Sequence, residues 1–162
     1  MEPARNDTGP HVTSYSITVE APADELYTLV ADPHRHHEFH GSQTVQARAR
    51  GPRELTNGAR FSVHMRKYGL PYRLPLRVTQ ARRPTSATPG IVEWRQPTGH
   101  RWSWEFEPLD AASTRVTESY DATSQWRVIR ATLRLAQVPR VNAESIQRSL
   151  RHMAKICRPP GH

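Results

Sequence analysis

The alternation of apolar and polar residues is clearest in residues 100–121. Three aromatic side chains occupy every second position in the first half of this stretch: Trp102, Trp104 and Phe106. This is the two-residue period of a β-strand that has one buried and one solvated face. Turn-forming residues follow at 108–113, and the alternation resumes over 114–121 with β-branched and aromatic residues. The pattern predicts a long antiparallel hairpin.

The orientation of the second arm of this hairpin decides where an acidic residue lies. If the pleat is unbroken, Val116 and Tyr120 favour burial of the even-numbered positions, and Glu118 then lies among aromatic side chains. A slip of one residue in the register would instead move Glu118 to the outer face, beside Arg101 or Arg115. A surface ion pair with one of these arginines is the plainer expectation for Glu118, and both alternatives stay open.

The rest of the chain shows the same two periods. Five further segments alternate with a period of two and are predicted to be strands: residues 13–20, 44–50, 60–67, 74–82 and 91–96. Pro75 makes the start of the fourth of these irregular or places it at a sheet edge. A helical period predicts a helix opened by Pro22, a short second helix from Pro33 to about Gly41, and two helices after residue 121. Of these last two, one covers 124–136, and the other follows a break at Pro139 and ends near Cys157.

This order of elements predicts the fold class. One strand, two helices, six strands and terminal helices indicate an α+β fold in which helices cover one face of an antiparallel sheet. A chain of 162 residues is typical of one domain with a sizeable core. We expect residues 1–12 to form a flexible N-terminal arm, 13–157 a single domain, and 158–162 a flexible tail.

Charge and composition narrow the classes of partner. The formal net charge is +8, but the arginines are scattered, without a run of five basic residues or a nucleic-acid recognition motif. We therefore predict a solvated basic surface and no nucleic-acid partner. No apolar run approaches the roughly 20 residues of a transmembrane segment, and residues 1–11 lack the apolar core of a secretory signal. With a single cysteine, Cys157, these features favour a soluble, cytoplasmic protein.

Four histidines cluster in the predicted second helix: His34, His36, His37 and His40. Two of them, His36 and His40, would lie one helical turn apart and could share a metal ion. A third ligand at a suitable spacing is missing, so we predict no metal site. The cluster is interpreted instead as a helix at the mouth of a cavity, whose charge responds to mild acid.

Several segments resemble the START-like, or SRPBCC, helix-grip superfamily, and specifically its polyketide cyclase/dehydrase-type branch. The matching segments are residues 17–26, 29–33, 57–61, 102–109 and 114–121, together with a terminal helix over 142–155. The resemblance implies a seven-stranded curved antiparallel sheet wrapped around a long C-terminal helix, with two short helices between strands one and two and a deep cavity inside. Members bind lipids, sterols, polyketides or plant hormones, and some cyclise or dehydrate polyketide chains. The resemblance implies no cofactor.

We therefore expect a hydrophobic polycyclic or polyketide-like small molecule to bind in the cavity. Glu118, Tyr120 and His100 are the candidate catalytic residues, because a carboxyl group among tryptophans has a raised pKa and suits acid-base catalysis beside a group that polarises a ketone. The candidate ligand-binding residues are Phe39, Met65, Tyr72, Leu76, Trp94, Trp102, Trp104, Phe106, Leu150 and Met153. The alternatives are a non-catalytic carrier or sensor of lipid-like ligands and, more weakly, a module that docks on an acidic acyl carrier protein.

Overall fold

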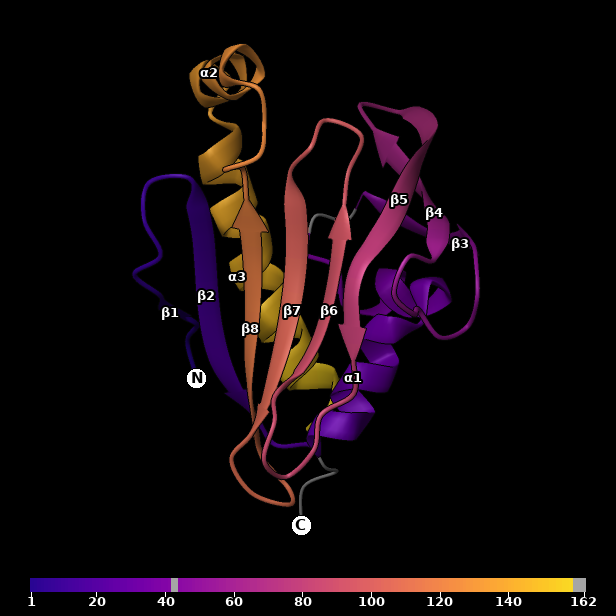
Figure 1. Cartoon of the computed structure of the whole chain (residues 1–162), viewed down its shortest axis with the longest axis vertical. Helices are drawn as coiled ribbons and strands as arrows, with labels where there is room; N and C mark the ends of the chain where they lie inside the picture. The colour runs from indigo at the N-terminus through magenta and orange to yellow at the C-terminus, as the bar shows by residue number, and fades with distance from the viewer. Residues whose placement is uncertain (42–43, 159–162) are drawn as a thin grey trace.

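The computed structural model describes residues 1–41 and 44–158 (Figure 1). Within these residues eight antiparallel strands form one sheet in the order β1-β2-β8-β7-β6-β5-β4-β3. The strands are β1 (Ala4–Arg5), β2 (Val12–Val19), β3 (Val45–Arg50), β4 (Arg60–Lys67), β5 (Leu70–Arg82), β6 (Gly90–Arg95), β7 (Arg101–Pro108) and β8 (Thr114–Asp121). The helices are α1 (Ala23–Ala31), the 3-10 helix η1 (Pro33–Glu38), α2 (Arg127–Leu135) and α3 (Val138–Ile156).

The helices cover one face of the sheet, as the α+β prediction requires. Helix α3 packs against β2 and β8, α1 against β6 and β7, and η1 against β3 and β4. Figure 1 shows α3 and α1 behind the strands, on the same side of the sheet. The long antiparallel sheet and the C-terminal helix are those of a helix-grip fold, and the 100–121 hairpin is confirmed as β7 and β8.

The sheet has eight strands rather than the seven that the resemblance implies. The additional strand is β1, which lies in the segment expected to be a flexible arm and pairs with residues 15 and 16 of β2. The side chain of Asn6 donates hydrogen bonds to the hydroxyl groups of Ser14 and Ser16, at 2.9 and 2.8 Å. These side-chain bonds hold the N-terminal segment against the sheet. Residues 159–162 of the expected tail lie outside the described part of the chain.

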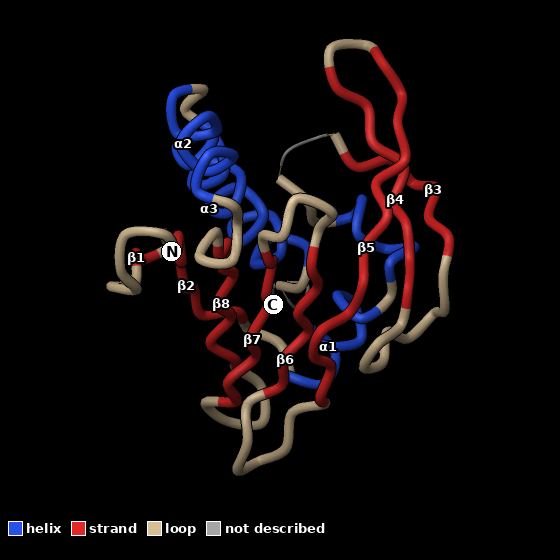
Figure 2. Tube along the Cα trace, turned by 45° about the horizontal axis from the view of Figure 1, so that its top comes forward, coloured by secondary structure: helices blue, strands red, loops and turns tan. Residues whose placement is uncertain are grey.

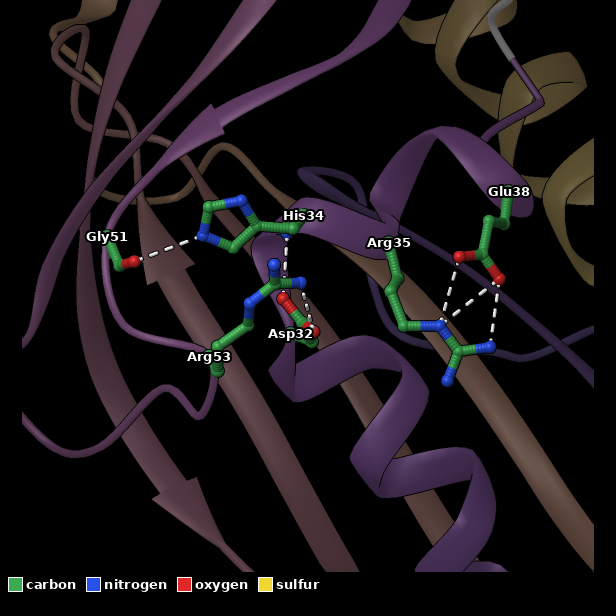
Figure 3. Close-up of polar contacts among 6 residues, drawn as sticks. All are labelled: Asp32, His34, Arg35, Glu38, Gly51 and Arg53. Atoms are coloured by element: carbon green, nitrogen blue, oxygen red, sulfur yellow. Dashed lines mark hydrogen bonds and ion pairs between the residues drawn. The ribbon is translucent and has the colours of Figure 1, made fainter.

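The helices also differ in detail from the prediction. The second helix is a 3-10 helix that ends at Glu38, and Asp32 caps it by accepting a 2.9 Å hydrogen bond from the backbone N–H of His34 (Figure 3). The break between the last two helices is at Gln137, whose φ of 56° is left-handed. Pro139 lies in the first turn of α3, where the missing N–H has no helical partner to lose.

Strand β5 explains how a proline is accommodated inside the sheet. Its first half, which contains Pro75, pairs with β4 only, because β6 pairs with residues 77–82. Pro75 therefore has a free edge on one side, as predicted. The β4–β5 hairpin consequently extends beyond β6, and it turns at Tyr68 and Gly69, whose φ values of 51° and 77° are those of a primed two-residue turn.

Candidate functional site

The acidic residue of the hairpin lies inside the fold. Val116, Glu118 and Tyr120 form the buried face of β8, and Glu118 is 1% exposed. Its neighbours across the sheet are Trp104 on β7 and Tyr15 on β2. The unbroken alternation has therefore placed this carboxyl group on the face that packs against α3.

The expected ion pair of Glu118 with a neighbouring arginine is wrong. Arg115 instead donates to a carboxylate oxygen of Glu107 at 2.8 Å, on the outer face of the sheet. Arg101 lies 3.9 Å from Glu93, also on that face. Since the period of a strand is two, arginines at odd-numbered positions cannot reach a carboxyl group at an even one.

Burial without a cation sets the protonation state of Glu118. Desolvation raises the pKa of its carboxyl group well above the ordinary value, and a hydrogen bond with the hydroxyl of Ser149 on α3 lowers it in part. The Oε2 atom of Glu118 has no hydrogen-bond partner among the described residues. Ser149 also accepts a 2.8 Å hydrogen bond from the backbone N–H of Gly41. The site therefore favours the neutral form of this carboxyl group and leaves its Oε2 atom without a partner among the described residues.

A second polar group lies where β7 begins and β8 ends. Gln125 donates its side-chain N–H to Nδ1 of His100 at 3.0 Å and is hydrogen-bonded to the hydroxyl of Tyr120. The hydroxyl of Thr98 lies 2.7 Å from the same histidine nitrogen. Burial lowers the pKa of His100 to about 4 and raises that of Tyr120. Both side chains are therefore neutral at physiological pH, and the ring of Tyr120 also packs against Trp102.

The structure thus brings the three candidate catalytic residues onto one face. Glu118 and Tyr120 are two positions apart on β8, which corresponds to about 7 Å, and the ring centroids of His100 and Tyr120 are 5.0 Å apart. The sequence analysis missed Ser149 and Gln125. Gln125 lies in a loop and gives no periodic signal, whereas Ser149 occupies a buried position beside Leu150 of α3, so a polar residue at that position was a usable signal.

The candidate ligand-binding residues differ in how far they are buried. Seven are buried in the core, namely Phe39, Leu76, Trp94, Trp104, Phe106, Leu150 and Met153. Met65 and Trp102 are partly buried, and Tyr72 is 43% exposed. The expected deep cavity is therefore filled by side chains at its centre. Two surface hollows of about 480 and 460 Å³ lie elsewhere, one along residues 5–12 and one between residues 84–86 and 108–111.

Within the histidine cluster, His36 is not the acid-responsive side chain at a cavity mouth that was expected. His36 is 3% exposed, stacks on Trp94 at a centroid distance of 5.2 Å, and donates its Nε2–H to the carbonyl of Val30 at 2.8 Å. Burial lowers the pKa of His36 to about 4, so it stays neutral in mild acid. His36 is a core residue rather than a residue at a cavity mouth.

The outer side chains of this segment make surface contacts. Nε2 of His34 lies 3.1 Å from the carbonyl oxygen of Gly51, and Arg35 forms an ion pair with Glu38 at 2.9 Å (Figure 3). Among the described residues, no three histidine, cysteine or acidic side chains are grouped so that they could hold a metal ion. No described helix combines the length and the apolar character needed to cross a membrane.

Comparison with known proteins places these observations in context. The sequence model of the family described as "Polyketide cyclase / dehydrase and lipid transport" matches residues 10–158. Over 115 residues, or 71% of its length, the chain is 50% identical to the uncharacterized protein Rv0088 of Mycobacterium tuberculosis H37Rv. That match covers 49% of the relative, so the chain spans about half the length of the curated relatives it matches.

Solved structures share the fold. The Zhui aromatase/cyclase from Streptomyces sp. R1128 superposes with a TM-score of 0.59 at 17% identity, over 91% of this chain and 95% of the other. The di-domain aromatase/cyclase BexL, from the BE-7585A biosynthetic pathway, superposes with a TM-score of 0.55 at 18% identity, over 88% of this chain and 47% of that one. At these identities the likeness shows the fold alone.

Proposed function

Because this chain belongs to the polyketide cyclase/dehydrase and lipid transport family, we propose that it binds a hydrophobic, polycyclic or polyketide-like molecule between the sheet and α3. We further propose that it cyclises or dehydrates this molecule by acid-base chemistry without a cofactor. The observation that carries the proposal is Glu118, a neutral, fully buried carboxyl group with an oxygen that no described residue contacts. Burying a carboxyl group that lacks a full set of hydrogen bonds costs free energy of folding. Buried carboxyl groups with a shifted pKa are for this reason candidates for functional residues.

The chemistry of Glu118 suits a dehydration. Its proton would pass to the departing β-hydroxyl group, which leaves as water, and the resulting carboxylate would take the proton from the adjacent carbon. The acid is regenerated and no oxidant or metal is needed. The hydroxyl of Tyr120, held by Gln125, is one strand step away and would donate a hydrogen bond to a ketone oxygen of the substrate.

The ligand would enter at the end of the sheet where β7 begins. Trp102 and Met65 are partly exposed there, whereas Trp104 and Phe106, farther along β7, are fully buried. Binding near Glu118 therefore requires the side chains of the open end to move apart. Rotation of Trp102 and Tyr120, whose rings are in edge contact, is the smallest such change.

The proposal is tested first by native mass spectrometry of freshly purified protein, which should detect a co-purified hydrophobic compound. A linear poly-β-ketone thioester then serves as substrate for Glu118→Gln, which keeps the shape of the side chain and removes its proton. We expect turnover to fall by about 10²–10⁴-fold while binding is retained. Glu105→Gln, on the exposed face of β7, is the matched control and should leave turnover unaltered.

Unchanged turnover in Glu118→Gln and in Tyr120→Phe would remove the catalytic proposal. Infrared spectroscopy supplies an independent check, because a protonated carboxyl band at neutral pH should be present in the parent protein and absent in Glu118→Gln. If that band is missing from the parent, Glu118 is ionised and cannot act as the proposed acid.

A non-catalytic carrier is the second candidate, and the lining favours it in one respect. Among the described residues, the buried side chains of the β7–β8 face include Trp104, Phe106 and Val116, which offer a ligand only apolar contact. A carrier would retain a bound ligand without converting it, and Glu118→Gln would change neither affinity nor product. Recovery of the same unconverted compound from the parent and the variant would decide for this alternative.

A further inference from the structure

Helix α2 exposes apolar side chains that nothing in the described chain covers. None of its nine residues is buried, and α3 is the element against which the helix packs. Trp126, which precedes its first turn, is 79% exposed, and Val128 and Leu135, seven positions apart on one face, are 78% and 87% exposed. Ile129 and Leu133, one turn apart, are half-buried, as expected for the inner stripe of a surface helix. Trp126, Val128 and Leu135 form a second, exposed apolar set, which indicates an external partner.

The charge of α2 points to an anionic partner. Arg127, Arg130 and Arg134 are spaced as one face of the helix, and the sequence between Asp121 and Glu144 contains no acidic residue. Arg127 and Arg134 form no ion pair with any described residue. A helix with arginines on one face and tryptophan, valine and leucine elsewhere has the composition of helices that lie in a membrane interface.

The tip of the β4–β5 hairpin also carries exposed apolar side chains next to basic residues without ion pairs in the described chain. Tyr68 is 93% exposed and Leu70 is 71% exposed, at the turn that extends beyond β6. The neighbouring basic residues are exposed as well and form no ion pair within the described chain; they are Arg66, Lys67 and Arg73. The sequence between Glu54 and Glu93 contains no acidic residue.

Both elements project from the same end of the molecule. Figures 1 and 2 show α2 and the β4–β5 hairpin as two separate protrusions beyond the end at which β7 begins and β8 ends. Two narrow tips at a distance from each other can be contacted together by an extended surface. Exposed aromatic and aliphatic side chains next to basic residues without ion pairs are suited to a membrane. Its headgroups are anionic, and the acyl chains below them are apolar.

We propose that this end of the molecule, with Trp126, Val128 and Leu135 of the α2 region and Tyr68 and Leu70 of the hairpin, docks on an anionic lipid surface. The docked orientation would turn the open end of the sheet, with Trp102 and His100, toward the membrane. A ligand that partitions into lipid could then reach the β7–β8 face without crossing water. The docking itself does not depend on any catalytic role of Glu118.

The test uses the full chain and vesicles of phosphatidylcholine with or without phosphatidylserine. Cosedimentation should show binding to the phosphatidylserine vesicles that weakens as salt is added. The emission of Trp126 should shift to the blue on binding, and Trp126→Phe should remove most of that shift. Neutral vesicles should bind much more weakly.

Matched charge variants locate the contact. The double variant Arg127→Gln/Arg134→Gln should weaken binding to the anionic vesicles about 30-fold, which corresponds to about 1 kcal/mol for each charge. The double variant Arg82→Gln/Arg115→Gln has the same net charge and should change binding less than about threefold. Its residues lie at the end of β5 and the start of β8, opposite α2 in Figure 1.

Apolar variants complete the test, since all these side chains are exposed and their replacement should leave the melting temperature unchanged. Val128→Ser/Leu135→Ser and Tyr68→Ser/Leu70→Ser should each weaken vesicle binding. The proposal is overturned if the parent protein does not bind anionic vesicles, or if the two charge variants lose equal affinity. Binding to an acidic acyl carrier protein that competes with vesicles for the same arginines would assign the surface to that protein partner instead.

Discussion

The two halves of the β7–β8 face differ in burial although their sequence pattern is the same. Trp104 and Glu118 are each 1% exposed on the helix-covered face of the sheet, whereas Trp102, one strand step away, is partly exposed at the end where β7 begins. In this closed half, which contains Trp104 and Glu118, burial raises the pKa of the Glu118 carboxyl group and favours its neutral form. In the open half Trp102 is only partly buried, and the buried side chains of Tyr120 and His100 belong to a hydrogen-bonded polar group. The same alternation of apolar and polar residues therefore gives fully buried side chains in one half of the face and a partly exposed side chain in the other.

The largest expected difference between the two halves is in the cost of truncation. Trp104→Ala should lower the free energy of unfolding by about 3–5 kcal/mol, because it leaves a cavity where Phe39 now makes an edge contact at 5.3 Å. Trp102→Ala should cost less than half as much, since its ring already contacts solvent. Urea denaturation of both variants measures this, and equal losses would mean that the open half is as tightly packed as the closed one.

The buried histidines predict how the free energy of unfolding depends on pH. The pKa of His36 is about 4 in the folded protein and about 6.5 when unfolded, so the unfolded state binds a proton that the folded state does not. The free energy of unfolding should fall as the pH drops from 6.5 to 4, by about 3 kcal/mol for this residue. His36→Gln should flatten that part of the curve.

His37→Gln, at an exposed position of the same segment, is the matched control for replacing a histidine there. His100 has the same lowered pKa of about 4 and adds a second contribution of the same sign. If the stability of His36→Gln declines in acid as steeply as that of the parent protein, the buried neutral histidine is not the cause.

A close backbone approach to α3 provides a third test. A Cβ atom at Gly41 would lie 2.5 Å from the backbone nitrogen of Ser149 and 2.6 Å from the carbonyl oxygen of Ser145. Gly41→Ala should therefore cost about 1–3 kcal/mol of stability, because this segment must move away from the helix. Thermal and urea unfolding measure the loss. Ser149→Ala, which removes the hydrogen bonds of this hydroxyl with Gly41 and with Glu118, should cost about 2 kcal/mol.

The smallest effect is expected on the outer face of the sheet. Arg115→Gln removes the 2.8 Å ion pair with Glu107, but both side chains are about half exposed. The change in the free energy of unfolding should be about 0.5 kcal/mol or less. A loss that approaches the one in Trp104→Ala would show that the outer face carries more of the stability than its burial indicates.

Local pattern predicted the strands well because a strand alternates its side chains strictly. Residues 60–67 and 114–121 were assigned with the boundaries that the structure shows, and burial of Val116 and Tyr120 brought Glu118 inside. The predicted strand 74–82 begins four residues after the start of β5, because Pro75 indicated an irregular start or an edge and β5 also contains Pro71. The hairpin tolerates both prolines because it has one partner strand there.

The prediction for the histidines failed for a different reason. An α-helical spacing of His36 and His40 was assumed, but the segment is a 3-10 helix that ends at Glu38. The ring of His36 is enclosed by Trp94 and Phe61, which come from β6 and β4. No local pattern contains that information, because both partners are distant along the chain.

The sequence by itself determined which residues form strands and which of their side chains share a face, because both follow from a period of two within each segment. Only the tertiary structure decided that Ser149 meets Glu118, that Gln125 meets His100, and that the centre of the expected cavity is filled. Hydrogen-bond partners and desolvation depend on segments that are far apart in the chain. The chemistry of Glu118 therefore comes from packing, whereas its position comes from the alternation of β8.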